Sequence, residues 1–351
     1  MSKNFFEIKN ADFKVGNSVK VKNVTFNIEN KGDIICLLGP SGIGKTTILR
    51  SIAGLEKINK GVIKIKNKVI SSLKINIEPE NRNVSLAFQE NSLFPHYTIE
   101  KNIYFGTERK SKNKRIEPKK IIKLLNIGSL LHKYPHQISA GEAQRASLAR
   151  SLVSNPDLLL LDEPLSNIDE NFKEEIQIKL KQILKQYKIT TIVVTHDSNE
   201  AFYLADKCGV ILNGKLTQFD DPYNVYHSPK SIDIVRFLNR GVLVPARVLS
   251  EYTLENKDLG LIKGNFVKRH DVGTEVKLLI QPEDLEHDDK SSLQLDVIDK
   301  KFKGTNFIYT LKTKSNKNIS VFVHSHHVHQ HQINDTFGIK KPIHIKHLVC
   351  F

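Results

Sequence analysis

The fold of this 351-residue chain is decided by the stretch Gly39-Pro40-Ser41-Gly42-Ile43-Gly44-Lys45-Thr46. An apolar run at residues 34–38 precedes it and predicts a buried strand, and a helix is predicted to follow from about residue 44 to residue 53. Glycines let a backbone wrap around a phosphate, while N–H groups of the loop and of the helix N-terminus supply positive potential. The stretch therefore predicts a phosphate-binding loop in an α/β domain.

The polar residues of this loop have expected tasks. Lys45 would reach the β- and γ-phosphates of a nucleotide and is a candidate catalytic residue, and the Thr46 hydroxyl would ligate Mg²⁺. Thr47 and the other loop residues would line the nucleotide. The alternative is a chance glycine-rich turn, which the strand–loop–helix context disfavours.

A second apolar strand, residues 158–161, ends in the pair Asp162-Glu163. Open α/β sheets place ligand-binding groups at the carboxyl ends of their strands. Asp162 would hold Mg²⁺ through a water molecule, and Glu163 would polarise the attacking water as general base. An acidic pair that merely caps a turn is the alternative, and the phosphate loop makes it the minor one.

His196 follows another predicted strand, residues 192–195, and Asp197 after it is a plausible helix N-cap. A lone histidine is usually structural. Because His196 would lie at the same edge of the sheet as the other two motifs, a contact to the γ-phosphate is the favoured hypothesis.

The rest of the chain predicts two domains. A strand at residues 84–88 and an amphipathic helix at 172–187 complete the α/β pattern, and a helical insertion lies between residues 106 and 135. Short alternating runs after residue 239 predict a mostly-β second domain with strands at 242–248, 276–280, 307–311 and 319–323.

Composition narrows the function classes without choosing one. The three cysteines are far apart, which predicts neither a disulfide framework nor a zinc ribbon, and the N-terminus lacks the pattern of a secretory signal. No apolar run is long enough to cross a bilayer. The net charge of +15 fits nucleic acid, an anionic membrane surface or simple solubility. The lysines are spread along the chain without aromatic interleaving, so charge alone decides nothing.

The stretch from Ile138 to Arg145, ISAGEAQR, resembles the LSGGQ signature of ABC ATPases. The resemblance covers the first domain and implies a phosphate-loop NTPase core, residues 1–238, with a helical subdomain at about 90–155. It implies ATP and Mg²⁺ as cofactors, and a head-to-tail homodimer in which the signature of one copy covers the ATP of the other. The residues that it adds to the nucleotide site are Phe13 for adenine stacking, Gln89 as a Mg²⁺ contact, Ser139, Gly141, Glu142 and Asp169.

The signature departs from LSGGQ at Ile138, Ala140 and Glu142. Ala140 adds a methyl group where the backbone must approach closely, and Glu142 places a carboxylate near a triphosphate. A second hypothesis is therefore a regulatory subunit that binds ATP and dimerises but turns over slowly.

Among ABC proteins, a separate importer subunit fits best, because the sequence has one signature and neither membrane helices nor a long coiled coil. Residues 239–351 resemble the oligonucleotide-binding-like regulatory domain of the maltose, sulfate, polyamine and ferric-iron importer group. The resemblance implies membrane-spanning permease subunits, an external substrate-binding protein acting indirectly, and a peripheral location on the cytoplasmic side of the membrane.

Two stretches, residues 237–241 and 325–329, resemble the ferric-iron importers, so Fe(III) import is favoured over polyamine, sulfate or sugar import. A soluble ABC ATPase that binds nucleic acid is the remaining alternative. It is disfavoured because the second domain has no aromatic cluster for stacking bases.

A histidine-rich stretch lies near the C-terminus. Alternation on a strand would place His327, His329 and His331 on one face, where imidazoles could bind a metal. Ordinary surface histidines on a polar strand and turn are the favoured reading.

Overall fold

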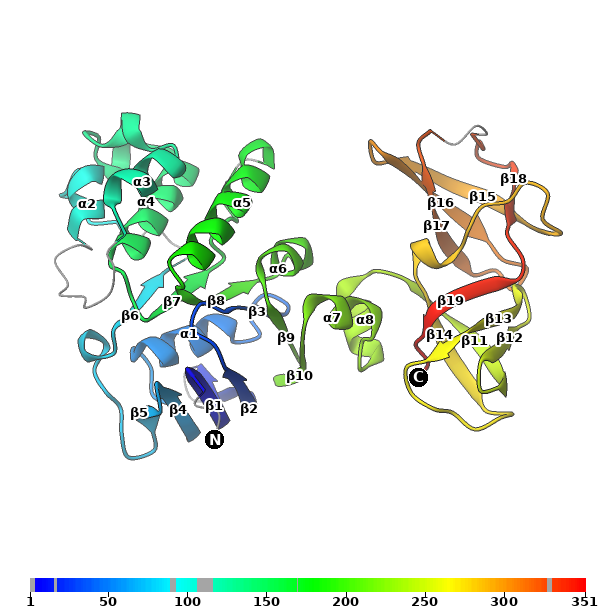
Figure 1. The fold of residues 1–351 in the computed structure, drawn as a ribbon, viewed down its shortest axis with the longest axis horizontal. Coiled ribbons are helices and arrows are strands. Elements are labelled where there is room, and N and C mark those ends of the chain that lie inside the picture. The colour runs from blue at the N-terminus through cyan, green and yellow to red at the C-terminus, as the bar shows by residue number, and fades with distance from the viewer. Residues whose placement is uncertain (1–3, 16–17, 89–92, 106–115, 169, 327–329) are drawn as a thin grey trace. The chain divides into compact units, whose positions relative to one another are not determined.

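The fold is described from a computed structural model, covering all residues except 1–3, 16–17, 89–92, 106–115, 169 and 327–329. By internal packing the chain divides into two units, residues 1–225 and 226–351 (Figure 1). This division differs from the 238/239 boundary expected from sequence, because helix α8 belongs to the second unit.

A largely parallel sheet forms the centre of the N-terminal unit, with strand order β10-β9-β3-β8-β7-β6. Four of its strands are the predicted apolar runs, and β10 joins antiparallel at one edge. Strands β3, β7 and β8 are buried at every position, which is why they read as continuous apolar runs. The strands are β3 (Ile34–Leu38), β6 (Val84–Ala87), β7 (Leu158–Asp162), β8 (Thr190–Thr195), β9 (Lys207–Leu212) and β10 (Lys215–Asp220).

A second, antiparallel sheet of order β2-β1-β4-β5 was not predicted from the sequence. Its strands are interrupted by register shifts, so the alternation that marks a strand is broken. Helix α1 (Lys45–Ala53) contacts strands of both sheets, and one apolar core joins the layers. The strands are β1 (Phe6–Val15), β2 (Ser18–Ile28), β4 (Lys60–Ile65) and β5 (Lys68–Ser72).

The remaining helices of this unit form the predicted helical part and the cover of the sheet. Helices α2, α3 and α4 lie together (Figure 1). Helix α5 is the predicted amphipathic helix, although Phe172 at its start is 47% exposed and does not join the core. The bounds are α2 (Ile99–Phe105), α3 (Pro118–Leu124), α4 (Ala140–Val153), α5 (Glu170–Gln186) and α6 (Ser198–Leu204), and the division between the two units falls within α7 (Pro222–His227).

The C-terminal unit confirms the mostly-β prediction. After α8 (Ile232–Leu238), a sheet of order β14-β11-β12-β13-β19 and a sheet of order β17-β16-β15-β18 share one apolar core. Parallel pairing of β13 with β19 brings the end of the chain back to the first sheet. The strands are β11 (Val242–Ser250), β12 (Thr253–Asn256), β13 (Gly260–Phe266), β14 (Glu275–Ile280), β15 (Leu293–Phe302), β16 (Asn306–Lys312), β17 (Asn318–His324), β18 (Thr336–Ile339) and β19 (Ile343–Leu348).

Candidate nucleotide-binding site

The phosphate loop connects β3 to α1, as predicted, and two of its glycines are required by its shape. Gly44 takes a φ of 109°, and a Cβ atom there would lie 2.8 Å from Val21 Cγ2. At Gly39, a Cβ atom would lie 2.5 Å from the carbonyl oxygen of Ile211. Pro40, Ser41 and Gly42 are exposed, Ile43 is half-buried, and Thr47 is buried in the first turn of α1.

Lys45 is folded back onto this loop. Its ammonium group donates to the carbonyl oxygens of Gly39 at 2.7 Å and Pro40 at 3.0 Å, and 5% of the residue is exposed. Burial lowers the pKa of Lys45, while the nearby carboxylates of Glu163 and Asp162 act to raise it. A cation is therefore held at the phosphate loop within reach of both acidic residues.

Asp162, the last residue of β7, faces the phosphate loop. Its carboxylate accepts a hydrogen bond from the Thr46 hydroxyl. Burial raises the pKa of Asp162, and the adjacent Glu163 adds to this, while the bond from Thr46 and the charge of Lys45 oppose it. A hydroxyl and a carboxylate side by side form a hard oxygen donor set that suits Mg²⁺.

Glu163 is held in an unusual backbone conformation. Its φ is 47°, in the left-handed region, and its N–H donates to the carbonyl oxygen of Val194 at 2.9 Å. The carboxylate lies 3.0 Å from Nδ1 of His196. Because the carboxylate oxygen accepts, Nδ1 is the protonated ring nitrogen in this pair. The structure thus brings Glu163, His196 and Lys45 to one edge of the sheet, as the sequence predicted.

Gln144, on the buried side of α4, contacts the backbone of Glu163, and the sequence analysis did not predict this. Its amide donates to the carbonyl oxygen of Glu163 at 2.8 Å, and its oxygen accepts from the N–H of Asn167 at 3.1 Å. Gln144 therefore ties the signature helix to the backbone of Glu163. The sequence signal was a glutamine among apolar helix positions, since a buried amide needs partners.

The signature residues start helix α4. Ser139 is the exposed N-cap, accepting from the N–H of Glu142 at 3.3 Å, while the Glu142 carboxylate accepts from the N–H of Ser139 at 2.8 Å. These bonds lower the pKa of Glu142. The glutamate that looked like a departure from the signature is thus the second half of a capping box. A Cβ atom at Gly141 would lie 2.7 Å from the carbonyl oxygen of Asn167, so a glycine is needed there for packing.

One predicted site residue does not join this arrangement. Phe13 was assigned to adenine stacking, and the structure contradicts this: its side chain is fully buried in the apolar core, which leaves no ring face for a base. Gln89 and Asp169 lie outside the described residues.

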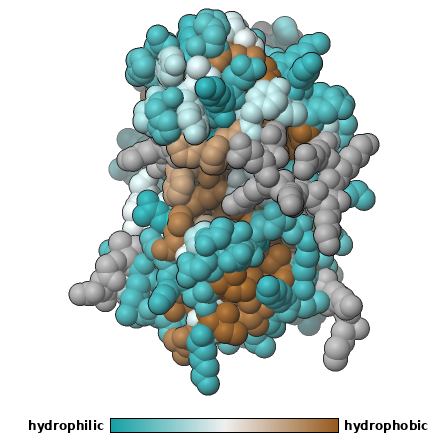
Figure 2. All heavy atoms as spheres, turned by 90° about the vertical axis from the view of Figure 1, so that its left-hand side faces the viewer, coloured by the Kyte–Doolittle hydropathy of each residue, from teal (hydrophilic) through white to brown (hydrophobic). Residues whose placement is uncertain are grey.

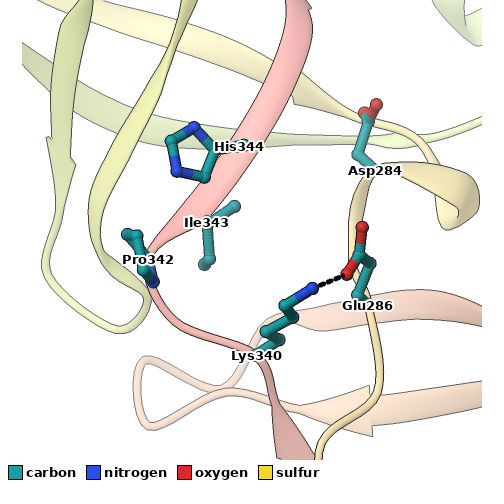
Figure 3. Close-up of a pocket in the computed structure, with 6 residues that line it drawn as sticks. All are labelled: Asp284, Glu286, Lys340, Pro342, Ile343 and His344. Carbon is teal, nitrogen blue, oxygen red and sulfur yellow. Dashed lines mark hydrogen bonds and ion pairs between the residues drawn. The ribbon is translucent and has the colours of Figure 1, made fainter.

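A hollow in the C-terminal unit is too small to be a second nucleotide site. Its volume is about 50 Å³, room for a few water molecules. Figure 3 shows that Lys340 and Glu286 form an ion pair across it. The residues that line it are Asp284, Glu286, Lys340, Pro342, Ile343 and His344.

Comparison with known proteins identifies the family. A family model described as ABC transporter matches residues 21–166. The Fe(3+) ions import ATP-binding protein FbpC of Haemophilus influenzae strain 86-028NP is 35% identical over 75% of this chain and 78% of that protein. This chain belongs to the ABC transporter ATPases.

Other relatives agree with this assignment. FbpC of Fusobacterium nucleatum is 33% identical over 90% of this ABC ATPase and 85% of that protein. The spermidine/putrescine import ATP-binding protein PotA of Clostridium novyi is 33% identical, covering 89% of each chain. Both kinds of relative are importer subunits by name.

A solved structure matches part of the chain. It is the dimeric, post-hydrolysis ATP-binding cassette MJ0796 bound to ADP and Pi, with a TM-score of 0.55 and 27% identity. It covers 62% of this ABC ATPase and 98% of its own length. Among the described residues of the present chain, no helix is long and apolar enough to cross a membrane.

Proposed function

We propose that this ABC ATPase energises Fe(III) import as a homodimer on the cytoplasmic side of the membrane. Its partners would be membrane-spanning permease subunits and, indirectly, an external substrate-binding protein. The proposal that this protein hydrolyses ATP rests on the Glu163–His196 pair beside Lys45. The cargo is supported by the FbpC relatives, which are named for Fe(3+) import. In this proposal residues 239–351 form the regulatory domain.

The described residues support a division of labour in hydrolysis. Lys45 would exchange its two carbonyl partners for β- and γ-phosphate oxygens. Glu163 would polarise the attacking water, with His196 Nδ1 orienting the carboxylate. That contact leaves Nε2 of His196 as the ring nitrogen that would reach the γ-phosphate.

Thr46 and Asp162 would hold Mg²⁺, with Asp162 acting through a water molecule and Gln89 as a further proposed contact. When bound, the ion neutralises charge on the phosphates. The hydrogen bond between Thr46 and Asp162 supports this proposal, because it places a hydroxyl oxygen and a carboxylate side by side at the end of the loop.

A head-to-tail dimer would complete each site. Ser139 is exposed at the start of α4, where N–H groups and the helix dipole favour an anion. Across the dimer, Ser139 and Gly141 of one copy would approach the γ-phosphate held by Lys45 of the other, with Glu142 and Asp169 nearby. The similarity to the cassette MJ0796, described as dimeric, supports this arrangement.

The permease would dock on the face of the N-terminal unit seen in Figure 2, where apolar residues gather between hydrophilic ones. Exposed apolar side chains near this end of the unit include Leu73 beside β5 and Phe105 at the end of α2. The Phe105 ring lies 4.9 Å from the ring of Phe94, and the Arg150 guanidinium lies 5.0 Å from that of Phe94. Arg150 is on α4, the helix that begins after Ser139. A movement of Phe94 and Phe105 would therefore be passed to the signature at the start of that helix.

Uptake measurements test the cargo. Cells lacking the chromosomal copy would carry wild type, Glu163→Gln or the control Glu175→Gln, and would be given radiolabelled Fe(III) and, separately, radiolabelled spermidine. Glu175 is a suitable control because its side chain is 55% exposed on α5, away from the proposed site. Fe(III) uptake is expected to persist with wild type and Glu175→Gln and to be lost with Glu163→Gln.

A polyamine importer is the second candidate, because a PotA relative matches as much of the chain as the FbpC relatives do. Loss of spermidine uptake in Glu163→Gln cells with unchanged Fe(III) uptake would replace the first proposal with the second.

A further inference from the structure

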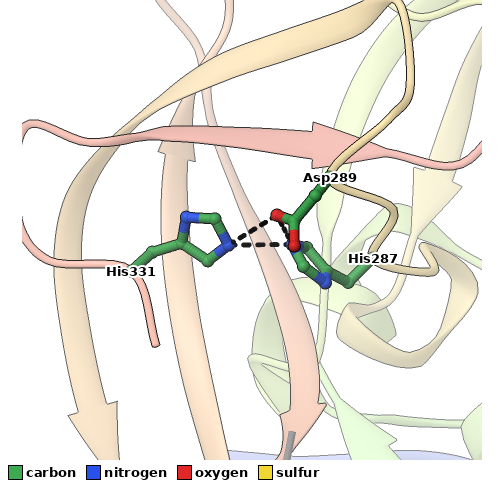
Figure 4. Close-up of side chains that lie close together, drawn as sticks. All are labelled: His287, Asp289 and His331. Atoms are coloured by element: carbon green, nitrogen blue, oxygen red, sulfur yellow. Dashed lines mark hydrogen bonds and ion pairs between the residues drawn. The ribbon is translucent and has the colours of Figure 1, made fainter. Parts of the chain in front are cut away.

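Two histidines and an aspartate converge in the C-terminal unit. Figure 4 shows His287, Asp289 and His331 pointing toward one another. The two Nε2 atoms are 2.8 Å apart, and the Asp289 Oδ1 atom lies 2.9 Å from Nε2 of His287 and 3.2 Å from Nε2 of His331. The side chains of His287 and His331 are 5% and 13% exposed, and Asp289 is 39% exposed. Three ligand-type atoms thus form a small triangle whose open side is at Asp289.

Backbone hydrogen bonds hold the segment that carries His287 and Asp289 against strand β18. The N–H of Asp288 donates to the carbonyl oxygen of Gly338 at 3.0 Å, and the N–H of Lys340 donates to that of Glu286 at 2.9 Å. A Cβ atom at Gly338 would lie 2.0 Å from the Asp288 carbonyl oxygen, so only glycine permits this approach. Residues 286–289 are therefore fixed beside the strand.

His331, the third member of the triangle, is held by Tyr309 and Phe337. The backbone of His331 is hydrogen-bonded to the Tyr309 hydroxyl. The ring of Phe337 lies 4.4 Å from the ring of His287 and 4.9 Å from that of His331, so its position in the core sets the distance between the two imidazoles. Both ligand segments are thus held before any ion binds.

Hydrogen bonds alone do not satisfy this triangle. An ionised carboxylate only accepts, and each Nε2 atom carries at most one hydrogen. If both imidazoles donate to Asp289, two N–H groups face each other at the His287–His331 contact. If one imidazole donates to the other, a nitrogen lone pair faces the carboxylate oxygen. One of the three contacts is repulsive in either case, whereas a cation at the centre attracts all three atoms.

We propose that His287, Asp289 and His331 form a binding site for a divalent first-row transition-metal ion, such as Zn²⁺ or Fe²⁺. Two imidazoles with one carboxylate are the ligands of such ions, while Mg²⁺ and Ca²⁺ prefer all-oxygen sets. Ligands around 2.0–2.1 Å from a tetrahedral ion stand roughly 3.3 Å apart. The observed triangle needs only a small expansion to reach this spacing. The aromatic rings of Phe337 and Tyr309 pack together beside the triangle and form an apolar shell of the kind that limits solvent access to a metal site.

This site differs from the one that the histidine-rich stretch suggested. His331 belongs to both, but its partners here come from a segment 44 residues earlier in the chain. His327 and His329 lie outside the described residues. The proposed site is independent of the transport function, because its test requires neither hydrolysis nor a permease.

Titration of the full-length, chelator-stripped protein with Co²⁺, without nucleotide, tests the site. Binding of one Co²⁺ per chain with visible absorption bands is expected, and Zn²⁺ should displace the ion. An anaerobic titration with Fe²⁺ measures which ion binds more tightly; by the general order of affinities Zn²⁺ should exceed Fe²⁺. Absence of saturable binding by all three ions would overturn the proposal.

Variants separate this site from surface histidines. His331→Gln and the more exposed Asp289→Asn should each weaken Co²⁺ binding at least about tenfold, since even the loss of a residue that only supports a ligand costs 10–100-fold. The matched control is the double variant His324→Gln/His326→Gln, at exposed positions of the same stretch, and should bind as wild type does. Circular dichroism shows whether each variant is folded. Unchanged affinity in both folded site variants, or an equal loss in the control, would show that the ions bind elsewhere.

Discussion

The nucleotide site and the His287–Asp289–His331 cluster bring charged groups together in different ways. The first is open: Asp162 and Glu163 lie at the end of β7 and face Lys45 at the start of α1, with His196 exposed. The second is nearly closed, because two loop segments flank one strand and the aromatic core covers them. An open site is accessible to a large ligand, whereas the closed one brings three ligand-type atoms within 3.2 Å of one another, a spacing that suits only the single ion proposed for it.

The largest expected effect concerns the open site. Glu163→Gln should lower the ATPase rate by about 100- to 10,000-fold, because it would remove the proposed general base while keeping the side chain's shape. ATP binding and ATP-driven dimerisation should persist, measured by light scattering, and Co²⁺ binding in the C-terminal unit should not change. A hydrolysis rate within a few fold of wild type would show that another group acts as the base.

The next effect concerns the closed site. Phe337 is fully buried against both imidazoles, so Phe337→Ala should destabilise the C-terminal unit by about 3–5 kcal/mol. Calorimetry should show the transition of that unit at a lower temperature, and Co²⁺ affinity should fall with it. Phe302→Ala is the matched control, because that ring is 63% exposed and should change little. If Phe337→Ala also lowered the affinity for ATP, the nucleotide site and the C-terminal unit would be energetically coupled.

A pH experiment separates two carboxyl groups of the N-terminal unit. Burial raises the pKa of Glu200 to about 7, against its ordinary 4.5, although its carboxylate accepts from the Thr195 hydroxyl at 2.8 Å. The folded state therefore keeps the proton longer than the unfolded state, and stability falls as pH rises from about 4.5 to 7. Glu200→Gln should be more stable than wild type above pH 7, by up to about 3 kcal/mol, and equal to it below pH 4.5. Denaturant unfolding at pH 4 and pH 8 checks this, and equal differences at both pH values would contradict it.

The pH dependence of stability at Glu142 has the opposite sign to that at Glu200, and its expected effect is the smallest. Its pKa is lowered by the bond from the Ser139 N–H, so its contribution is present above its ordinary pKa of 4.5 and is lost as pH falls through the lowered value. Glu142→Gln should cost about 0.5 kcal/mol at pH 7 and nothing at strongly acid pH, measured by the same unfolding experiment. A several-fold gain in ATPase rate in this variant would instead restore the idea that the glutamate weakens the signature.

The comparison also explains which site could be read from the sequence. The phosphate loop is contiguous, because successive backbone N–H groups must surround one phosphate, so Gly39 to Thr46 form a motif. Asp162, Glu163 and His196 were found because each follows an apolar strand. His287 and Asp289 carry no such signal. They meet His331 only because distant segments pack beside strand β18 in one particular register, which the sequence does not reveal.

Errors in the sequence analysis have the same physical origin. Phe13 is an aromatic residue on a strand, and whether its ring faces a ligand or the core depends on the register shifts of β1 against β2. Glu142 looked unfavourable because its carboxylate was judged by its distance from a nucleotide, although it sits at the third position of a helix that Ser139 caps. Gln144 was missed because its partners are backbone groups of a distant segment.

By itself, the sequence determined the α/β core, the mostly-β second unit, the phosphate loop and the acidic and histidine residues that end the strands. These follow from apolar periodicity and from contiguous motifs, which are local properties of a chain. Only the tertiary structure decided that Phe13 is core, that Gln144 ties the signature helix to Glu163, and that His287 and Asp289 meet His331. Each of these depends on which distant segments lie side by side, and that is set by sheet register and by close approaches such as the one that Gly338 permits.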